Sequence, residues 1–107
     1  MFARNVYFRV KSLDMTAEFD RIFQTEILPV LRQQEGFRGE LTLSNPGSLE
    51  QIAISLWDSK DYADAYDSNV YPQVLRILAR VTDGRPKIRI YAGVNLSVNP
   101  PAWSEDR

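Results

Sequence analysis

The sequence predicts an α+β fold in which four antiparallel strands and two helices follow one another as β-α-β-β-α-β. Apolar and polar residues alternate in four stretches, as in strands that bury one face. Between the first and second stretches, and between the third and fourth, apolar residues recur every three to four positions, as in amphipathic helices. The predicted strands span residues 2–11, 37–44, 50–57 and 87–98.

The first helix is expected to begin at Thr16, a favourable N-cap residue, and to end near Gly36, which can adopt a left-handed cap. Pro29 lies inside the helical pattern and cannot donate a backbone hydrogen bond. It therefore predicts a kink near Thr25 or Glu26.

The second helix is expected to follow Asp58, which stands at an N-cap position directly after the third strand. The pair Ser68-Asn69 predicts a break in this helix. Pro72 suits the first turn of a restarted helix, where a missing N–H is no loss. The turn residues 83–86 are expected to end it.

This element order predicts a four-stranded ferredoxin-like sheet with both helices on one face. The set Ile52, Ile54 and Leu56 is assigned to the helix side. We treat residues 1–98 as one domain and 99–107 as a C-terminal arm with Trp103 as its anchor. The opposite sheet face is expected to collect polar and aromatic residues, namely Asn5, Tyr7, Arg9, Glu40, Thr42, Gln51, Ser55, Trp57, Arg89, Tyr91 and Asn95.

Composition excludes several kinds of chemistry. The chain of 107 residues has no cysteine and no histidine, which removes thiolate nucleophiles and the usual transition-metal ligands. We therefore expect no haem, flavin or metal cofactor. A net charge of −1 with interspersed signs gives no basic footprint for nucleic acid. No apolar run is long enough to span a membrane, and no signal peptide is recognisable, so a cytoplasmic protein is expected.

The polar and aromatic sheet face has two interpretations. A solvated face is common in antiparallel sheets. The alternative is a homodimer, in which a second copy closes the face and leaves a cavity for a small molecule. Two tyrosines and a tryptophan on this face favour the homodimer.

The segment LWDSKDYADAY (residues 56–66), together with Gly36-Phe37 and the restarted second helix, resembles the antibiotic biosynthesis monooxygenase domain. The resemblance covers residues 2–98 and implies a dimeric α+β barrel, in which two ferredoxin-like sheets close on each other. Members of this family include cofactor-independent monooxygenases, haem-degrading monooxygenases and domains without an assigned activity.

The haem-degrading branch does not fit. Its members use a histidine as the axial iron ligand where this chain has Arg76, and a tryptophan where this chain has Tyr66. Asn5 stands at the position of their first-strand asparagine. Arginine does not ligate iron, because it keeps its proton.

The cofactor-independent branch implies a site that binds a phenolic substrate and stabilises its anion. The function expected is therefore a monooxygenase acting on a small aromatic or quinol-type molecule. The alternative is a small-molecule-binding domain without turnover. Purely structural roles for these residues remain open. Trp57 would then belong to the core, Tyr62 and Tyr66 would pack the helix on the sheet, and Arg76 would lie on a solvated helix edge. The candidate catalytic residues are Asn5, Trp57, Tyr66 and Arg76, and the candidate substrate-binding residues are Tyr7, Arg9, Tyr62 and Tyr91.

Overall fold

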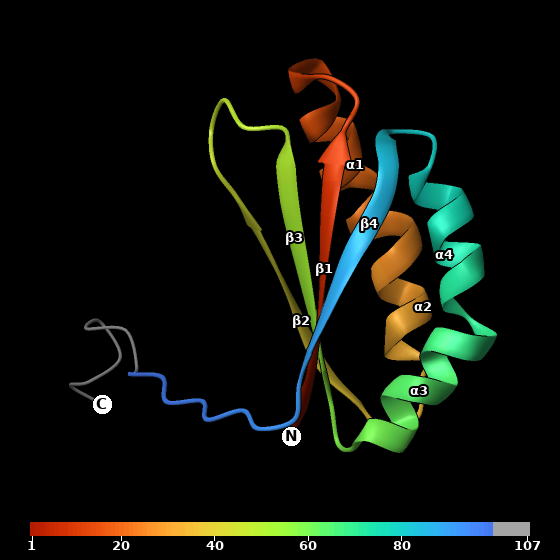
Figure 1. The fold of residues 1–107 in the computed structure, drawn as a ribbon, viewed down its shortest axis with the longest axis vertical. Coiled ribbons are helices and arrows are strands. Elements are labelled where there is room, and N and C mark those ends of the chain that lie inside the picture. The colour runs from red at the N-terminus through yellow and green to blue at the C-terminus, as the bar shows by residue number, and fades with distance from the viewer. Residues whose placement is uncertain (100–107) are drawn as a thin grey trace.

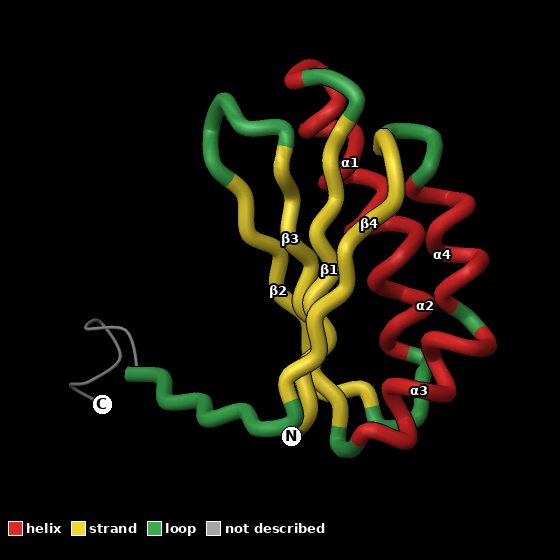
Figure 2. The backbone as a smooth tube through the Cα atoms, viewed as in Figure 1, coloured by secondary structure: helices red, strands yellow, loops and turns green. Residues whose placement is uncertain are grey.

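The computed structural model describes residues 1–99 and has the predicted β-α-β-β-α-β order. All helices lie on one face of a single antiparallel sheet with strand order β2-β3-β1-β4 (Figures 1 and 2). None of the helices in this part of the chain is long and apolar enough to cross a membrane. The strands are β1 (Phe2–Val10), β2 (Phe37–Ser44), β3 (Glu50–Trp57) and β4 (Thr82–Tyr91), and the helices are α1 (Thr16–Ile22), α2 (Leu28–Arg32), α3 (Lys60–Asn69) and α4 (Tyr71–Leu78).

The last strand differs from its prediction at both ends. β4 begins at Thr82 and ends at Tyr91, so residues 83–86 belong to the strand and 92–98 do not. The turn residues fit because the pairing of β1 with β4 shifts register between Tyr7 and Arg9. Gly84 has a φ of 69°, a conformation that glycine adopts at no steric cost. The expected arm and its anchor Trp103 lie, beyond residue 99, outside the described residues.

The first helix is interrupted where Pro29 predicted. A π-helical turn, Phe23–Ile27, separates α1 from α2, and Pro29 lies in the first turn of α2. α1 begins at Thr16 as expected, but the N-cap role expected of Thr16 was wrong, because the N-cap residue is Met15. A 3₁₀ turn, Leu13–Met15, precedes α1, and the Thr16 hydroxyl donates to the Leu13 carbonyl instead of capping the helix.

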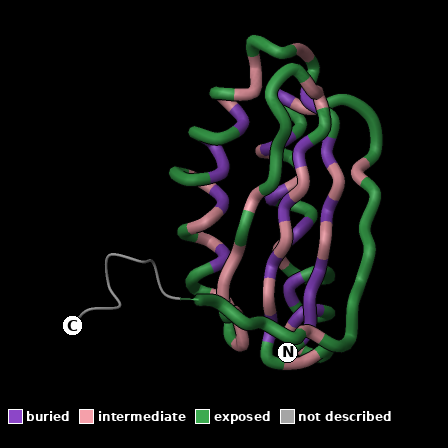
Figure 3. Tube along the Cα trace, turned by 90° about the vertical axis from the view of Figure 1, so that its left-hand side faces the viewer, coloured by how far each residue is buried: buried purple, intermediate pink, exposed green. Residues whose placement is uncertain are grey.

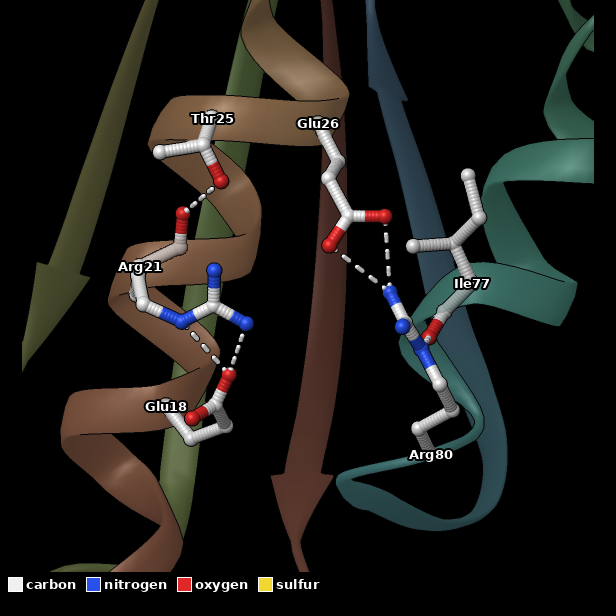
Figure 4. Close-up of polar contacts among 6 residues, drawn as sticks. All are labelled: Glu18, Arg21, Thr25, Glu26, Ile77 and Arg80. Carbon is white, nitrogen blue, oxygen red and sulfur yellow. Dashed lines mark hydrogen bonds and ion pairs between the residues drawn. The ribbon is translucent and has the colours of Figure 1, made fainter.

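An ion pair joins this interruption to the second helical segment. The Arg80 guanidinium, just after α4, donates to both carboxylate oxygens of Glu26 at 2.9 Å (Figure 4). Arg80 also donates to the carbonyl of Ile77 at the end of α4. Glu26 lies within the π-helical turn, so the pair connects the two helical segments at that turn.

The second helix breaks at Val70, as Ser68-Asn69 predicted, and Pro72 occupies the first turn of α4. Asp58 does not cap α3. The N-cap residue is Ser59, and the Asp58 carboxylate accepts a hydrogen bond from Arg38.

The assignment of β2 and β3 to the two sheet faces was reversed: Glu40 and Thr42 share the helix-covered face, and Leu41 and Leu43 the open one. Ser55 pairs with Arg4, and Ala53 pairs with Val6, so these side chains share the helix-covered face. On β3, the buried positions are the alternate ones from Gln51 to Trp57. Figure 3 views the face away from the helices. The apolar residues on that face are Leu41, Leu43, Ile52, Ile54 and Leu56.

Gly36 provides a test of the packing between the first helix and α3. Gly36 has a φ of 80°, and a Cβ added there would lie 2.3 Å from Cγ of Tyr62. We expect Gly36→Ala to lose about 1–2 kcal/mol of unfolding free energy from backbone strain and about 1–3 kcal/mol more from overpacking. Urea unfolding measures both losses.

Gly47→Ala is the matched control for that substitution. Gly47 has the same φ of 80°, and its Cβ would meet no atom of the described residues within 4 Å. It should therefore lose only the backbone contribution. Equal losses in the two variants would show that the Tyr62 contact imposes no packing constraint.

Candidate functional site

A row of polar side chains crosses the helix-covered face of the sheet. The backbone register places Glu40 of β2 opposite Ser55 of β3, and Ser55 opposite Arg4 of β1. Arg4 is 3% exposed and Ser55 is 6% exposed. Buried charged residues are rare unless they are paired, so this row is the first candidate for a functional site.

Arg4 lies against two aromatic rings and one carboxylate. Its guanidinium carbon is 3.9 Å from the ring centroid of Tyr71 and 5.3 Å from that of Tyr66. Arg4 Nη2 donates to Oδ1 of Asp67 at 2.6 Å. Cation–π contact and the ion pair together compensate for the hydration that the guanidinium loses.

Trp57 extends the aromatic part of this cluster. Its ring centroid is 5.1 Å from that of Tyr66 and 5.5 Å from that of Phe37. Trp57 Nε1 donates to Oγ of Ser55 at 2.9 Å, and the Ser55 hydroxyl in turn donates to the Arg4 carbonyl. These bonds fix the tryptophan ring next to Arg4.

The break between α3 and α4 brings Tyr66 and Tyr71 together. Tyr66 lies one turn before the end of α3, and Tyr71 is the first residue of α4. Their ring centroids are 6.1 Å apart. A change of direction at Val70 therefore lets both rings face Arg4.

Two hollows adjoin Arg4. One is an internal cavity of about 20 Å³, lined by Arg4, Glu40, Ser55 and apolar core residues, with room for about one water molecule. The other is a depression of about 160 Å³ between α3 and β4. Its lining residues are Arg4, Ala63, Asp64, Asp67, Ile88 and Ile90. Arg4 thus lines both a small cavity among core residues and a larger depression at the surface.

Burial shifts the titration of three groups near the cluster. It raises the pKa of the Glu40 carboxyl, and a hydrogen bond from the Thr42 hydroxyl opposes that shift. Burial also raises the pKa of the Tyr66 and Tyr71 phenols. Both phenols are therefore neutral at physiological pH, which leaves Asp67 as the counter-ion of Arg4.

The structure brings together only part of the predicted site. Trp57 and Tyr66 are buried and in contact. Asn5 pairs with Ile54 on the open face, and its Oδ1 is buried without a hydrogen-bond partner in the described chain. Arg76 is exposed on α4 and is not among the residues that line the hollows at Arg4.

The predicted substrate-binding residues are also dispersed. Tyr7 and Tyr91 belong to the open face, on β1 and β4. Arg9 is exposed beside the bulge in β4. Tyr62 packs on Gly36. The roles assigned to all eight predicted residues stay predictions.

The candidate site residues from the sequence did not include Arg4, Tyr71 or Asp67. The residues placed on the wrong face were Glu40, Thr42, Gln51, Ser55 and Trp57. The signal for Arg4 was present, because Arg4 is in phase with Val6, which was assigned to the core side. No group of three or more acidic side chains among residues 1–99 is arranged to hold a metal ion.

No protein-family model and no curated protein sequence matches the chain. Solved structures do. A Streptomyces coelicolor monooxygenase from the gene ActVA-Orf6, in complex with nanaomycin D, aligns with a TM-score of 0.75 at 13% identity over 92% of each chain. SnoaB, a cofactor-independent oxygenase from Streptomyces nogalater, aligns with a TM-score of 0.72 at 14% identity over 89% of this chain and 94% of its own.

A provisionally assigned antibiotic biosynthesis monooxygenase from Nitrosomonas europaea aligns with a TM-score of 0.70 at 20% identity, over 89% of this chain and all of its own. These alignments extend over most of the domain that the sequence predicted. The chain therefore has the fold of the antibiotic biosynthesis monooxygenase domains.

Proposed function

We propose that this protein is a monooxygenase that acts without a cofactor on a small aromatic or quinol-type molecule bound at Arg4. One observation carries the proposal: a guanidinium that is almost fully buried lies against the rings of Tyr66 and Tyr71. A planar phenol is apolar on its faces and carries one acidic oxygen. An arginine among aromatic rings suits both parts of such a molecule.

The proposed chemistry uses the substrate itself as the source of electrons. In the net change XH₂ + O₂ → XO + H₂O, the substrate loses two hydrogens, one oxygen atom enters the product and the other leaves as water. The protein has to stabilise the substrate anion that reacts with oxygen. Arg4 takes the anion-holding role that the sequence suggested for Arg76. Tyr66 packs against Arg4, and Trp57 packs against Tyr66, so both rings hold the guanidinium in position.

Glu40 is the proposed proton acceptor. The chain has no histidine, and Glu40 lines the same internal cavity as Arg4. Its raised pKa makes the carboxylate a better base than an exposed glutamate.

We also propose that the protein is a homodimer, closed through the open face of the sheet. That face carries a contiguous apolar set on β2 and β3, with Leu41 and Leu43 42% and 46% exposed. Large exposed apolar patches mark interaction sites. Asn5, Tyr7 and Tyr91 lie on the same face and would line the space between the two sheets.

Arg4→Gln and Arg76→Gln separate the two arginines as anion-binding groups. Isothermal titration calorimetry with a phenolate should show roughly 10- to 100-fold weaker binding for Arg4→Gln, since a charge-assisted hydrogen bond is lost. Arg76→Gln should bind as the wild type does. Weaker binding in Arg76→Gln with unchanged binding in Arg4→Gln would identify Arg76 as the anion-binding residue.

Oxygen consumption with 1,4-dihydroxynaphthalene then separates enzyme from binding domain. Wild-type protein should accelerate consumption above the rate without protein, and Arg4→Gln should lose most of that acceleration. Arg4-dependent binding without any acceleration would identify a binding domain without turnover.

Glu40 predicts the pH dependence of the reaction. A base acts in its deprotonated form, so the rate should rise with pH through the pKa of Glu40, which lies above its usual value because of burial. Thr42→Val removes the hydrogen bond that opposes the shift and should move this rise to higher pH. An unchanged profile in Glu40→Gln would exclude Glu40 as the base.

Sedimentation tests the proposed dimer. The wild type should sediment at twice the chain mass of 12.3 kDa at micromolar concentration. Ile54→Asp should give a monomer, because a charge would be buried in the interface. Gln73→Asp, on the exposed surface of α4, should remain dimeric. A wild-type monomer would contradict the proposal.

A further inference from the structure

The ion pair between Arg4 and Asp67 joins two very different environments. Arg4 is 3% exposed, whereas the side chain of Asp67 is 50% exposed. Asp67 lies on α3 and lines the 160 Å³ depression, while Arg4 lines both this depression and the internal cavity. Solvent and solutes can therefore reach the ion pair from the Asp67 side.

An anionic ligand would meet two opposing groups in this depression. Asp64 and Asp67 repel it, and the Arg4 guanidinium is already engaged by Asp67. The internal cavity of about 20 Å³ is too small for an aromatic molecule, so the ligand must lie at least partly in the depression. A ligand anion that binds Arg4 Nη2 from the depression then competes with the Asp67 carboxylate for that nitrogen.

The Tyr71 hydroxyl adds a polar group to the surroundings of Arg4. Tyr71 is 7% exposed, and its hydroxyl makes no hydrogen bond of regular geometry among the described residues. The adjacent Arg4 guanidinium opposes the rise in pKa that burial gives this phenol. The hydroxyl keeps its proton, so it can donate to a ligand oxygen held by the guanidinium.

We infer that Asp67 is a displaceable counter-ion that occupies the anion-binding position on Arg4 until a ligand enters through the depression between α3 and β4. The inference rests on the proposed binding of an aromatic anion at Arg4. It assigns the ligand class more narrowly, as an aromatic molecule carrying a carboxylate or phenolate. It also makes Asp67 a specificity-determining residue, because the ligand anion must compete with its carboxylate.

Asp67→Asn, measured with benzoate and its neutral analogue benzamide, tests this competition. Removing the competing charge should strengthen benzoate binding by about fivefold, the factor that a part-exposed ion pair is typically worth. Benzamide binding should change by less than about twofold, since it carries no charge to compete with Asp67. Isothermal titration calorimetry on the full chain measures both affinities, and the benzoate-induced rise in melting temperature should be larger in the variant.

Asp64→Asn is the matched control. Asp64 lies on the same helix and lines the same depression, but its carboxylate pairs with Lys60 at 2.6 Å and not with Arg4. It should strengthen benzoate binding by less than about twofold. Equal effects of Asp64→Asn and Asp67→Asn would overturn the inference. They would show that the acidic residues of α3 repel the ligand anion by their overall charge, without a specific role for Asp67.

The remaining outcomes separate this inference from the proposed function. Asp67-sensitive benzoate binding without oxygen consumption on any quinol supports the counter-ion and contradicts the monooxygenase. Oxygen consumption that depends on Arg4, with benzoate binding unchanged in Asp67→Asn, supports the monooxygenase and contradicts the counter-ion role of Asp67. Absence of benzoate binding in both wild type and Asp67→Asn overturns the inference. Weaker benzoate binding in Tyr71→Phe would support the hydroxyl as a ligand donor, and unchanged binding would remove it from the site.

Discussion

The buried charge of Arg4 is the constraint around which the helix-covered side of the sheet is arranged. A guanidinium that is 3% exposed loses most of its hydration, at a cost of several kcal/mol unless partners replace the water. The partners come from α3 and α4, which supply Asp67, Tyr66 and Tyr71. The direction change at Val70 is what allows both tyrosine rings to reach the same cation.

On β2 and β3, the two faces of the sheet have exchanged the roles that simple polarity would give them. The helix-covered face carries Glu40, Ser55 and Arg4 in one row, within an otherwise apolar core. The open face carries the leucine and isoleucine residues of β2 and β3. A protein that used this fold only for stability would gain more from the reverse arrangement, since burying polar groups costs free energy and exposing apolar ones gains none.

This exchange also explains what the sequence could and could not predict. Alternation and turn residues were sufficient for the element order, for the exact span of β3 and for both helix interruptions. Alternation identifies which residues share a face, but not which face meets the helices. Hydrophobicity assigned Ile54 to the core. Its neighbour Ser55 pairs with Arg4 on the helix-covered face, so the Ile54 side chain lies on the open face. The phase of Arg4 with Val6 indicated that Arg4 is buried, but nothing in the local sequence indicated its partners on α3 and α4.

The first helix interruption lies against the cavity beside Arg4, because Phe23, which begins the π-helical turn, lines that cavity. The second interruption, at Val70, lies on the aromatic side of Arg4, where Tyr71 begins α4. Segments with fewer regular helical hydrogen bonds open at a lower free-energy cost than continuous helices. A cavity with room for about one water can therefore enlarge at the π-helical turn without unfolding the sheet. Such an enlargement would serve the proposed chemistry, because a substrate ring that moves from the depression toward the core side of Arg4 leaves water behind.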